Sequence, residues 1–168
     1  MNRRIFEGVT VSDRDREFLK IAIDLAIEGV TSDRGGPFGA IVVQNDTIIG
    51  RGNNTVTSTN DPTAHAEIVA IRQACQTLKT FQLTGCTLYT SCEPCPMCLG
   101  AIYWARLDRI FYACTRHDAA EIGFDDSLIY REIDLPLARR RIPATQLLHQ
   151  DGLQAFLVWE QKMDKVLY

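Results

Sequence analysis

Apolar and polar positions alternate along this chain, first with helical and then with strand-like spacing. The first helical stripe starts after Ser12 or Asp13 and stops at Gly29. Because serine and aspartate favour helix N-termini and glycine favours the position after a helix, we expect one helix here. Its apolar face consists of Phe18, Leu19, Ala22, Ile23 and Ala26.

A glycine- and proline-rich segment at residues 35–37 separates this helix from two short apolar runs, at 38–43 and 47–52. Asn45 and Asp46 stand between the runs, and residues of this kind form the tight turns that join antiparallel strands. The pattern therefore predicts a β-hairpin.

The rest of the chain alternates between helical and strand patterns. Proline and polar residues at 61–63 precede a second helical stripe, and Pro94 precedes a third. We expect helices at 64–78 and 94–105, after residue 126 and from about residue 152, and strands at 87–90, 109–114 and 144–148.

The predicted order of elements is α-β-β-α-β-α-β-α-β-α. Strands that alternate with helices are typical of an α/β protein whose sheet carries helices on both faces. A length of 168 residues, with no repeat and no long linker, is the size of one domain. We therefore expect a single domain, 1–168, built on a mixed five-stranded sheet.

Composition and charge argue against a disordered, nucleic-acid-binding, membrane or exported protein. Hydrophobic residues make up 46% of the chain and charged residues 23%, which excludes wholesale disorder. The formal net charge is −3, so a general role in binding nucleic acid is disfavoured. No apolar run approaches the roughly 18 residues of a membrane span, and residues 1–7 lack the apolar core of a signal peptide. We expect a cytoplasmic protein without a membrane partner.

Three of the six cysteines crowd into residues 92–98. In a protein without an export signal, such crowding indicates metal or redox chemistry rather than disulfides. His65 and Glu67 lie at the predicted start of the second helix, about thirty residues earlier, and Cys95 and Cys98 at the start of the third. A helix N-terminus lowers the pKa of a cysteine, and so favours the thiolate that binds metal.

One imidazole and two thiolates make three zinc ligands, and a three-ligand site leaves the fourth tetrahedral position to water, as in catalytic sites. Glu67 stands two residues from His65, too far around a helix to bind the same metal, but it can exchange protons with the zinc-bound water. Two alternatives stay open: Cys92 as a fourth ligand of a closed structural site, and a zinc module without activity that serves dimerisation.

The motifs HAE (65–67) and PCPMC (94–98) follow the pattern of zinc deaminases. Residues 60–67 (NDPTAHAE) and 93–98 (EPCPMC) resemble the purine-directed members of the cytidine-deaminase superfamily. The segments GGPFG (35–39), LGAIYWAR (99–106) and GFDDS (123–127), with a terminal Tyr168, are most similar to the small bacterial guanine deaminases.

This resemblance implies a three-layer α/β/α fold and a homodimer with one zinc ion per subunit. The implied reaction converts guanine and water to xanthine and ammonia, by attack of zinc-bound hydroxide with a glutamate as proton shuttle. A C-terminal segment, about 150–168, would cross to the partner and close its active site.

Residue by residue, the resemblance assigns zinc to His65, Cys95 and Cys98, the proton shuttle to Glu67, and a second acid to Asp126. Substrate-binding residues would be Asn54, Phe38, Ala66, Trp104 and Tyr168, the last arriving from the partner subunit.

Simpler interpretations stand beside these roles. Asp126 can cap the helix that follows, Asn54 can belong to a turn, and Phe38 and Trp104 can be core residues. Within the same chemistry, a tRNA adenosine deaminase or another nucleobase deaminase, such as a cytosine deaminase, uses the same zinc motif. A tRNA enzyme requires a basic surface, which the net charge disfavours.

Overall fold

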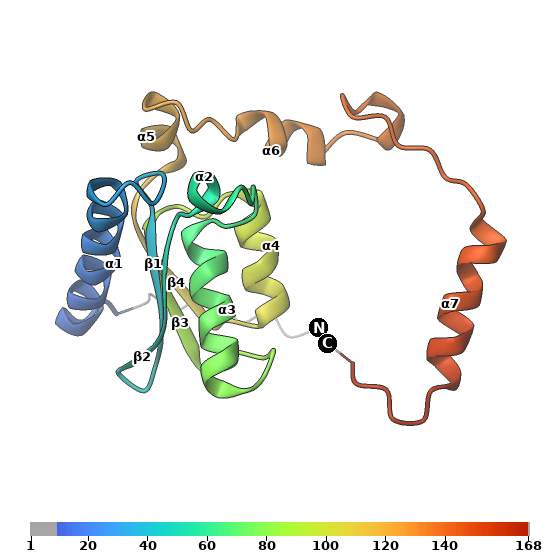
Figure 1. Ribbon diagram of the computed structural model, residues 1–168, viewed down its shortest axis with the longest axis horizontal. Coiled ribbons are helices and arrows are strands. Elements are labelled where there is room, and N and C mark those ends of the chain that lie inside the picture. Colours follow the sequence, from blue (N-terminus) through green and yellow to red (C-terminus); the bar gives the residue numbers. More distant parts are fainter. Residues whose placement is uncertain (1–9, 168) are drawn as a thin grey trace. The chain divides into compact units, whose positions relative to one another are not determined.

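The computed structural model describes residues 10–167 (Figure 1). The N-terminal stretch examined for a signal and the terminal Tyr168 lie outside the described residues. The chain divides into two compact units, residues 1–125 and 126–168, which are described separately below. None of the helices in the described range has the length and apolar character needed to cross a membrane.

A mixed four-stranded sheet organises the first unit, with strand order β2-β1-β3-β4. The outer pair β1–β2 and the pair β1–β3 are antiparallel, whereas β3 and β4 are parallel. The prediction of an α/β protein with a mixed sheet is therefore confirmed. The strands are β1 (Gly39–Gln44), β2 (Thr47–Asn53), β3 (Cys86–Cys92) and β4 (Arg109–Cys114).

The predicted hairpin is confirmed as β1–β2. Asn45 and Asp46 both have positive φ angles, 47° and 58°, which is the backbone of the two-residue turns that match the twist of paired strands. Asparagine and aspartate tolerate this left-handed conformation better than most residues.

Helices cover both faces of the sheet in the first unit (Figure 1). Successive residues of β1 point to opposite faces, so Ile41 and Val43 pack with α1 while Ala40 and Val42 pack with the helices on the other side. The helices are α1 (Asp13–Thr31) on one face, and α3 (Ala66–Leu78) and α4 (Pro96–Ala105) on the other.

Two glycines of β2 let α3 lie unusually close to the sheet. A Cβ atom at Gly52 would lie 2.1 Å from the carbonyl oxygen of Ala66, and one at Gly50 would lie 2.3 Å from that of Ala70. A side chain at either position would push the helix away, so these glycines set how closely α3 packs on β2.

Residue Ser12 caps α1 as predicted, with a reciprocal capping box to Asp15. The helix continues to Thr31 rather than ending at Gly29. Two short helices were not predicted, α2 (Val56–Thr59) and α5 (Arg116–Glu121). Each has too few residues for a helical period to be visible in the sequence.

The second unit contains α6 (Ser127–Ile133), the short 3-10 helix η1 (Leu137–Arg139) and α7 (His149–Gln161). The strand predicted at 144–148 is wrong, and with it the five-stranded sheet, because the sheet of the described residues has four strands. Residues 143–148 are exposed and irregular. An apolar run becomes a strand only where another strand accepts and donates its backbone hydrogen bonds, and here none pairs with it.

Candidate active site

Three predicted ligands converge in the first unit. Nδ1 of His65 lies 3.6 Å from Sγ of Cys95 and 3.6 Å from Sγ of Cys98. The ligand atoms of all three side chains lie within 4.8 Å of one another. Among the described residues, this is the one group of three or more histidine, cysteine and carboxylate side chains arranged to hold a metal ion.

Two helix starts bring these side chains together. His65 is the N-cap residue of α3, and its carbonyl accepts from Val69 N at 3.0 Å. Cys95 is the N-cap residue of α4, where Pro96 occupies the first helical position. Because Cys98 follows Cys95 by three residues, its side chain returns to the same face of the helix.

Ahead of α3, a polar turn fixes the approach to His65. Oδ1 of Asp61 accepts from the backbone N and the hydroxyl of Thr63, at 2.8 and 2.7 Å. The Ala64 carbonyl then accepts from Thr55 N at 3.0 Å, which ties the turn to the segment after β2. The backbone that leads into His65 is therefore fixed by hydrogen bonds within the turn and by the bond to Thr55.

The two sulfurs of the site do not share charge equally. The Cys98 thiol donates to Cys95, and this contact, together with His65, lowers the pKa of Cys95 to about 4 despite burial. The same contact and burial raise the pKa of Cys98. The hydrogen bond between His65 and Cys95 raises the pKa of the His65 imidazole. The second sulfur ionises readily only when a cation balances both charges, and zinc prefers this soft sulfur and nitrogen donor set.

Cys92 does not join this group. Its Sγ donates to the carbonyl oxygen of Thr115 at 3.5 Å, and burial raises its pKa to about 12. The closed site with Cys92 as fourth ligand is therefore not supported by the geometry, and the three donors retain one coordination position for another molecule.

Glu67 lies on the first turn of α3 and is only 6% exposed. Burial raises its pKa to about 7. A carboxyl group with such a pKa both accepts and returns a proton near neutral pH, which is the property required of a general acid–base. Its role as proton shuttle stays a prediction.

Asn54 is buried beside the start of β1, and its Oδ1 accepts from Gly36 N at 3.3 Å and from Val56 N at 3.2 Å. The contact with Val56 belongs to a turn, as the simpler interpretation predicted. Since both contacts use the oxygen, the amide NH₂ is the group of Asn54 left to donate to a ligand. Gly36 belongs to the segment GGPFG that carries the resemblance to guanine deaminases, but no role of its own was predicted for it.

Phe38 is half-buried, packs on the core shared with α3 and α4, and meets the ring of Phe124 edge-on. Ala66 has no exposed surface. Trp104 is 66% exposed and lies six residues, about 9 Å along the axis of α4, from Cys98. The substrate-binding roles of these three residues stay predictions.

Asp126 occupies the N-cap position of α6 but makes no side-chain capping hydrogen bond. It belongs to the second unit, and Tyr168 lies outside the described residues. The roles of both as second acid and lid therefore stay predictions.

Comparison with known proteins agrees with this centre. The family model of the zinc-binding region of cytidine and deoxycytidylate deaminases matches residues 12–114. The chain is 56% identical over 151 residues to guanine deaminase of Bacillus subtilis, covering 90% of this chain and 97% of that protein. The X-ray structure of that enzyme superposes with a TM-score of 0.89, over 91% of this chain and 98% of the other.

A second class of relative is more distant. The tRNA-specific adenosine deaminase of Buchnera aphidicola is 42% identical over 113 residues, which cover 67% of this chain and 74% of that protein. Its lower identity and coverage agree with the resemblance of the sequence to guanine deaminases. The converging donors and the matched region together establish that the chain belongs to the cytidine and deoxycytidylate deaminase family, with zinc as its cofactor.

Proposed function

We propose that this chain is a zinc-dependent guanine deaminase, which hydrolyses guanine to xanthine and ammonia. The observation that carries the proposal is the convergence of His65, Cys95 and Cys98 close to the buried Glu67. The 56% identity to the guanine deaminase of Bacillus subtilis, over nine-tenths of the chain, supports guanine as the base.

His65, Cys95 and Cys98 would hold the zinc ion. When bound there, zinc supplies a positive charge that lowers the pKa of water to about 7 and stabilises negative charge at the reacting atoms. The helix starts keep the three donors in place before any ligand arrives, so binding requires little reorganisation of the chain.

Glu67 moves the protons of the reaction. It accepts a proton from the attacking water as the C2–O bond forms and passes it to the neighbouring ring nitrogen of guanine. The 2-amino group then receives the proton of the new C2 hydroxyl, and the exocyclic C2–N bond breaks, so that ammonia leaves as C2=O forms. Asp126 would supply or relay that last proton. Because Glu67 lies in a buried position, its proton is not lost to bulk solvent.

The purine would be oriented by two residues near β1. The amide NH₂ of Asn54 donates to an acceptor on the base, since its oxygen is already occupied by Gly36 and Val56. The ring of Phe38 offers an apolar surface for stacking. A base that lacks the matching acceptor would leave the Asn54 amide unpaired, which is how such sites discriminate.

A second copy of the chain would complete the active site. We infer a homodimer in which the C-terminal segment, from about residue 150, packs on the partner. In support, α7 carries apolar side chains that nothing in its own unit covers, with Phe156 68% and Val158 69% exposed. Tyr168 would then arrive at the partner's active site as a lid.

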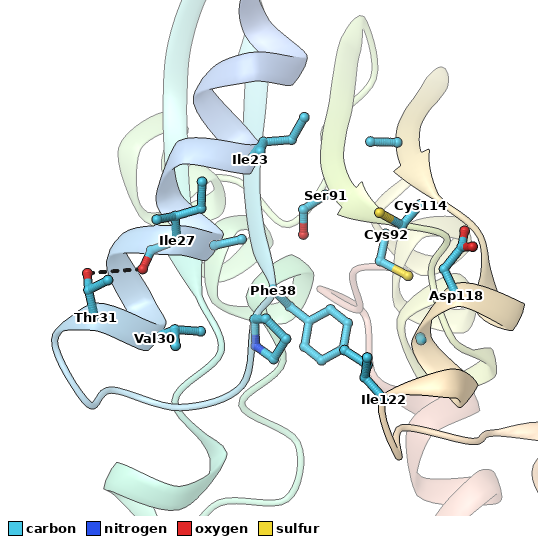
Figure 2. Close-up of a pocket in the computed structure, with 14 residues that line it drawn as sticks. Ile23, Ile27, Val30, Thr31, Phe38, Ser91, Cys92, Cys114, Asp118 and Ile122 are labelled. Atoms are coloured by element: carbon cyan, nitrogen blue, oxygen red, sulfur yellow. Dashed lines mark hydrogen bonds between the residues drawn. The ribbon is translucent and has the colours of Figure 1, made fainter.

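A groove in the first unit supports this arrangement. It has a volume of about 430 Å³ and runs between α1, the ends of β3 and β4, and α5 (Figure 2). Figure 2 shows the side chains of α1 facing those of β3, β4 and α5 across it. Its apolar lining includes Ile23, Ile27, Val30, Phe38, Ala113 and Ile122. A helix with an uncovered apolar face, such as α7 of a second copy, matches such a groove.

We place the enzyme in the cytoplasm, where a reducing environment keeps the sulfurs of Cys95 and Cys98 available as ligands. Incubation of the purified chain with guanine tests the function, with xanthine followed by absorbance and ammonia by a coupled assay. We expect stoichiometric xanthine and ammonia. Absence of xanthine together with inosine formation in tRNA would instead establish the adenosine deaminase alternative.

A further inference from the structure

An interlocked group of three residues lies at the entrance to β1. The rings of Phe38 and Phe124 meet edge-to-face, with centroids 4.9 Å apart and an interplanar angle of 89°. Gly36 fills the remaining space: a Cβ atom there would lie 3.2 Å from Cζ of Phe124 and 3.3 Å from Cδ2 of Phe38. Edge-to-face pairs of this kind are a preferred aromatic geometry. A methyl group at residue 36 would therefore shift both rings by a few tenths of an ångström.

The same group includes the backbone that orients Asn54. Gly36 N donates to Oδ1 of Asn54 at 3.3 Å, and Asn54 N donates to the carbonyl of Phe38 at 3.0 Å. Phe38 N in turn donates to the carbonyl of Gly36 at 2.8 Å. The backbone of Phe38 is thus hydrogen-bonded directly to the backbone of Asn54, and through Gly36 to the side-chain amide of Asn54.

Phe124 is held although it is 46% exposed. Its backbone N donates to Ala119 O at 2.9 Å at the end of α5, and Gly123 takes a positive φ of 95° to make this turn. The start of α5 is fixed by the capping box of Thr115 and Asp118. This constrained turn holds the ring of Phe124 edge-on against the ring of Phe38.

We propose that Phe124 is a positioning residue of the purine site: its ring holds Phe38 in the orientation against which guanine stacks. The inference rests on the proposed function, since it takes Phe38 as a substrate-binding residue. Asp126 follows Phe124 by two residues, so the covalent chain keeps their Cα atoms within about 7 Å of each other.

Steady-state kinetics of Phe124→Ala, Phe124→Tyr and Gly36→Ala test the proposal. For Phe124→Ala we expect KM for guanine to rise about fivefold and kcat to fall about tenfold, with zinc content unchanged. Phe124→Tyr keeps the ring and should stay within about twofold of wild type. Gly36→Ala should reproduce the rise in KM, because its methyl group displaces both rings. Glu121→Ala, an exposed change at the last residue of α5, serves as the matched control.

A purely structural role for Phe124 predicts a different pattern. It would lower the melting temperature of Phe124→Ala while leaving KM and kcat per folded chain unchanged, and that result would overturn the proposal. A double-mutant cycle adds a second criterion: in a Phe38→Ala background, Phe124→Ala should no longer change KM. An additive effect on KM would contradict the coupling. If wild type forms no xanthine, the proposed function fails as well, whereas active wild type with an indifferent Phe124→Ala defeats only this inference.

Discussion

The two units of the chain differ in how they bury their apolar residues. Every buried residue of the described range lies at or before Ala119, within the first unit. In the second unit no described residue is buried, although α7 carries Phe156, Leu157 and Val158. The first unit therefore has its own core, whereas the second presents an apolar helix that requires a surface supplied from elsewhere.

Catalytic residues follow the same division. The metal ligands and Glu67 stand on helix starts that rest on the sheet of the first unit. Asp126 and Tyr168 belong to the second unit, and of these two residues Tyr168 is the one predicted to act from the partner subunit. The metal ligands are therefore held by the part of the chain that has its own core, whereas the contribution of the second unit to the substrate site stays a prediction.

Removal of a metal ligand should cause the largest loss of activity, because it removes the zinc ion held by the first unit. In Cys98→Ala we expect zinc to fall below about a tenth of one ion per chain and turnover to become undetectable, because two remaining donors bind zinc weakly. Metal analysis and xanthine formation measure this. Cys92→Ala is the matched control, since Cys92 is equally a buried cysteine of the same segment but bonds to Thr115. Loss of zinc in the control as well would show that Cys92 is a ligand.

Glu67→Gln should separate metal binding from proton transfer within the first unit. The amide keeps the shape of the side chain but cannot carry a proton, so we expect kcat to fall about 10³-fold with zinc content and melting temperature close to wild type. Glu28→Gln, an exposed change on α1, controls for loss of charge. Near-normal turnover in Glu67→Gln would refute the shuttle.

The sequence predicted the three metal ligands better than it predicted the second unit. Ligands and shuttle were predicted because His65, Glu67, Cys95 and Cys98 stand at helix starts, where local signals and chemistry coincide. The false strand at 144–148 arose because apolar spacing reports that a segment needs a partner and not whether a partner exists. Gly36 was missed because the role of a glycine depends on what fills the space beside it, in this case two rings.

A charge on the apolar face of α7 should disturb assembly without disturbing the metal centre of the first unit. Phe156→Glu places a carboxylate in the middle of the uncovered apolar face, so we expect the dimer to dissociate and turnover to fall about tenfold while zinc stays bound. Sedimentation velocity and metal analysis of the same sample measure both. Gln154→Glu, on the same helix, should leave the assembly intact.

Deletion of Tyr168 tests the proposed lid, and we expect a loss of turnover as large as that of Phe156→Glu. Turnover should fall by about tenfold, and zinc content should not change, because the lid acts on the substrate and not on the metal. Unaltered turnover would remove the lid from the mechanism while leaving the metal centre in place.

The smallest effect is expected on the opposite face of the first unit. Tyr89 OH donates to Asp15 at 2.6 Å; burial opposes ionisation of that carboxyl, but hydrogen bonds from Ser12 and Tyr89 lower its pKa overall. Tyr89→Phe should lower the free energy of unfolding by about 1 kcal/mol. This is less than a buried hydrogen bond to a charged group contributes, because Asp15 is open to solvent.

The pH dependence of this effect follows from the direction of the shift. A lowered pKa in the folded state contributes stability above the ordinary value of Asp15, near 4, and loses it as the pH falls through the folded value. The difference between wild type and Tyr89→Phe should therefore be constant above about pH 5 and shrink below pH 4. Urea unfolding between pH 3 and pH 7 measures it, and a difference that grows on acidification would contradict the assignment.

X-ray absorption spectroscopy at the zinc edge of the purified chain tests the metal centre most directly. A centre held by His65, Cys95 and Cys98 predicts two sulfur ligands at about 2.3 Å and one imidazole nitrogen at about 2.0 Å, with an oxygen ligand in the fourth position. Three sulfur ligands, or a purified chain without zinc, would contradict the proposal of a catalytic deaminase centre.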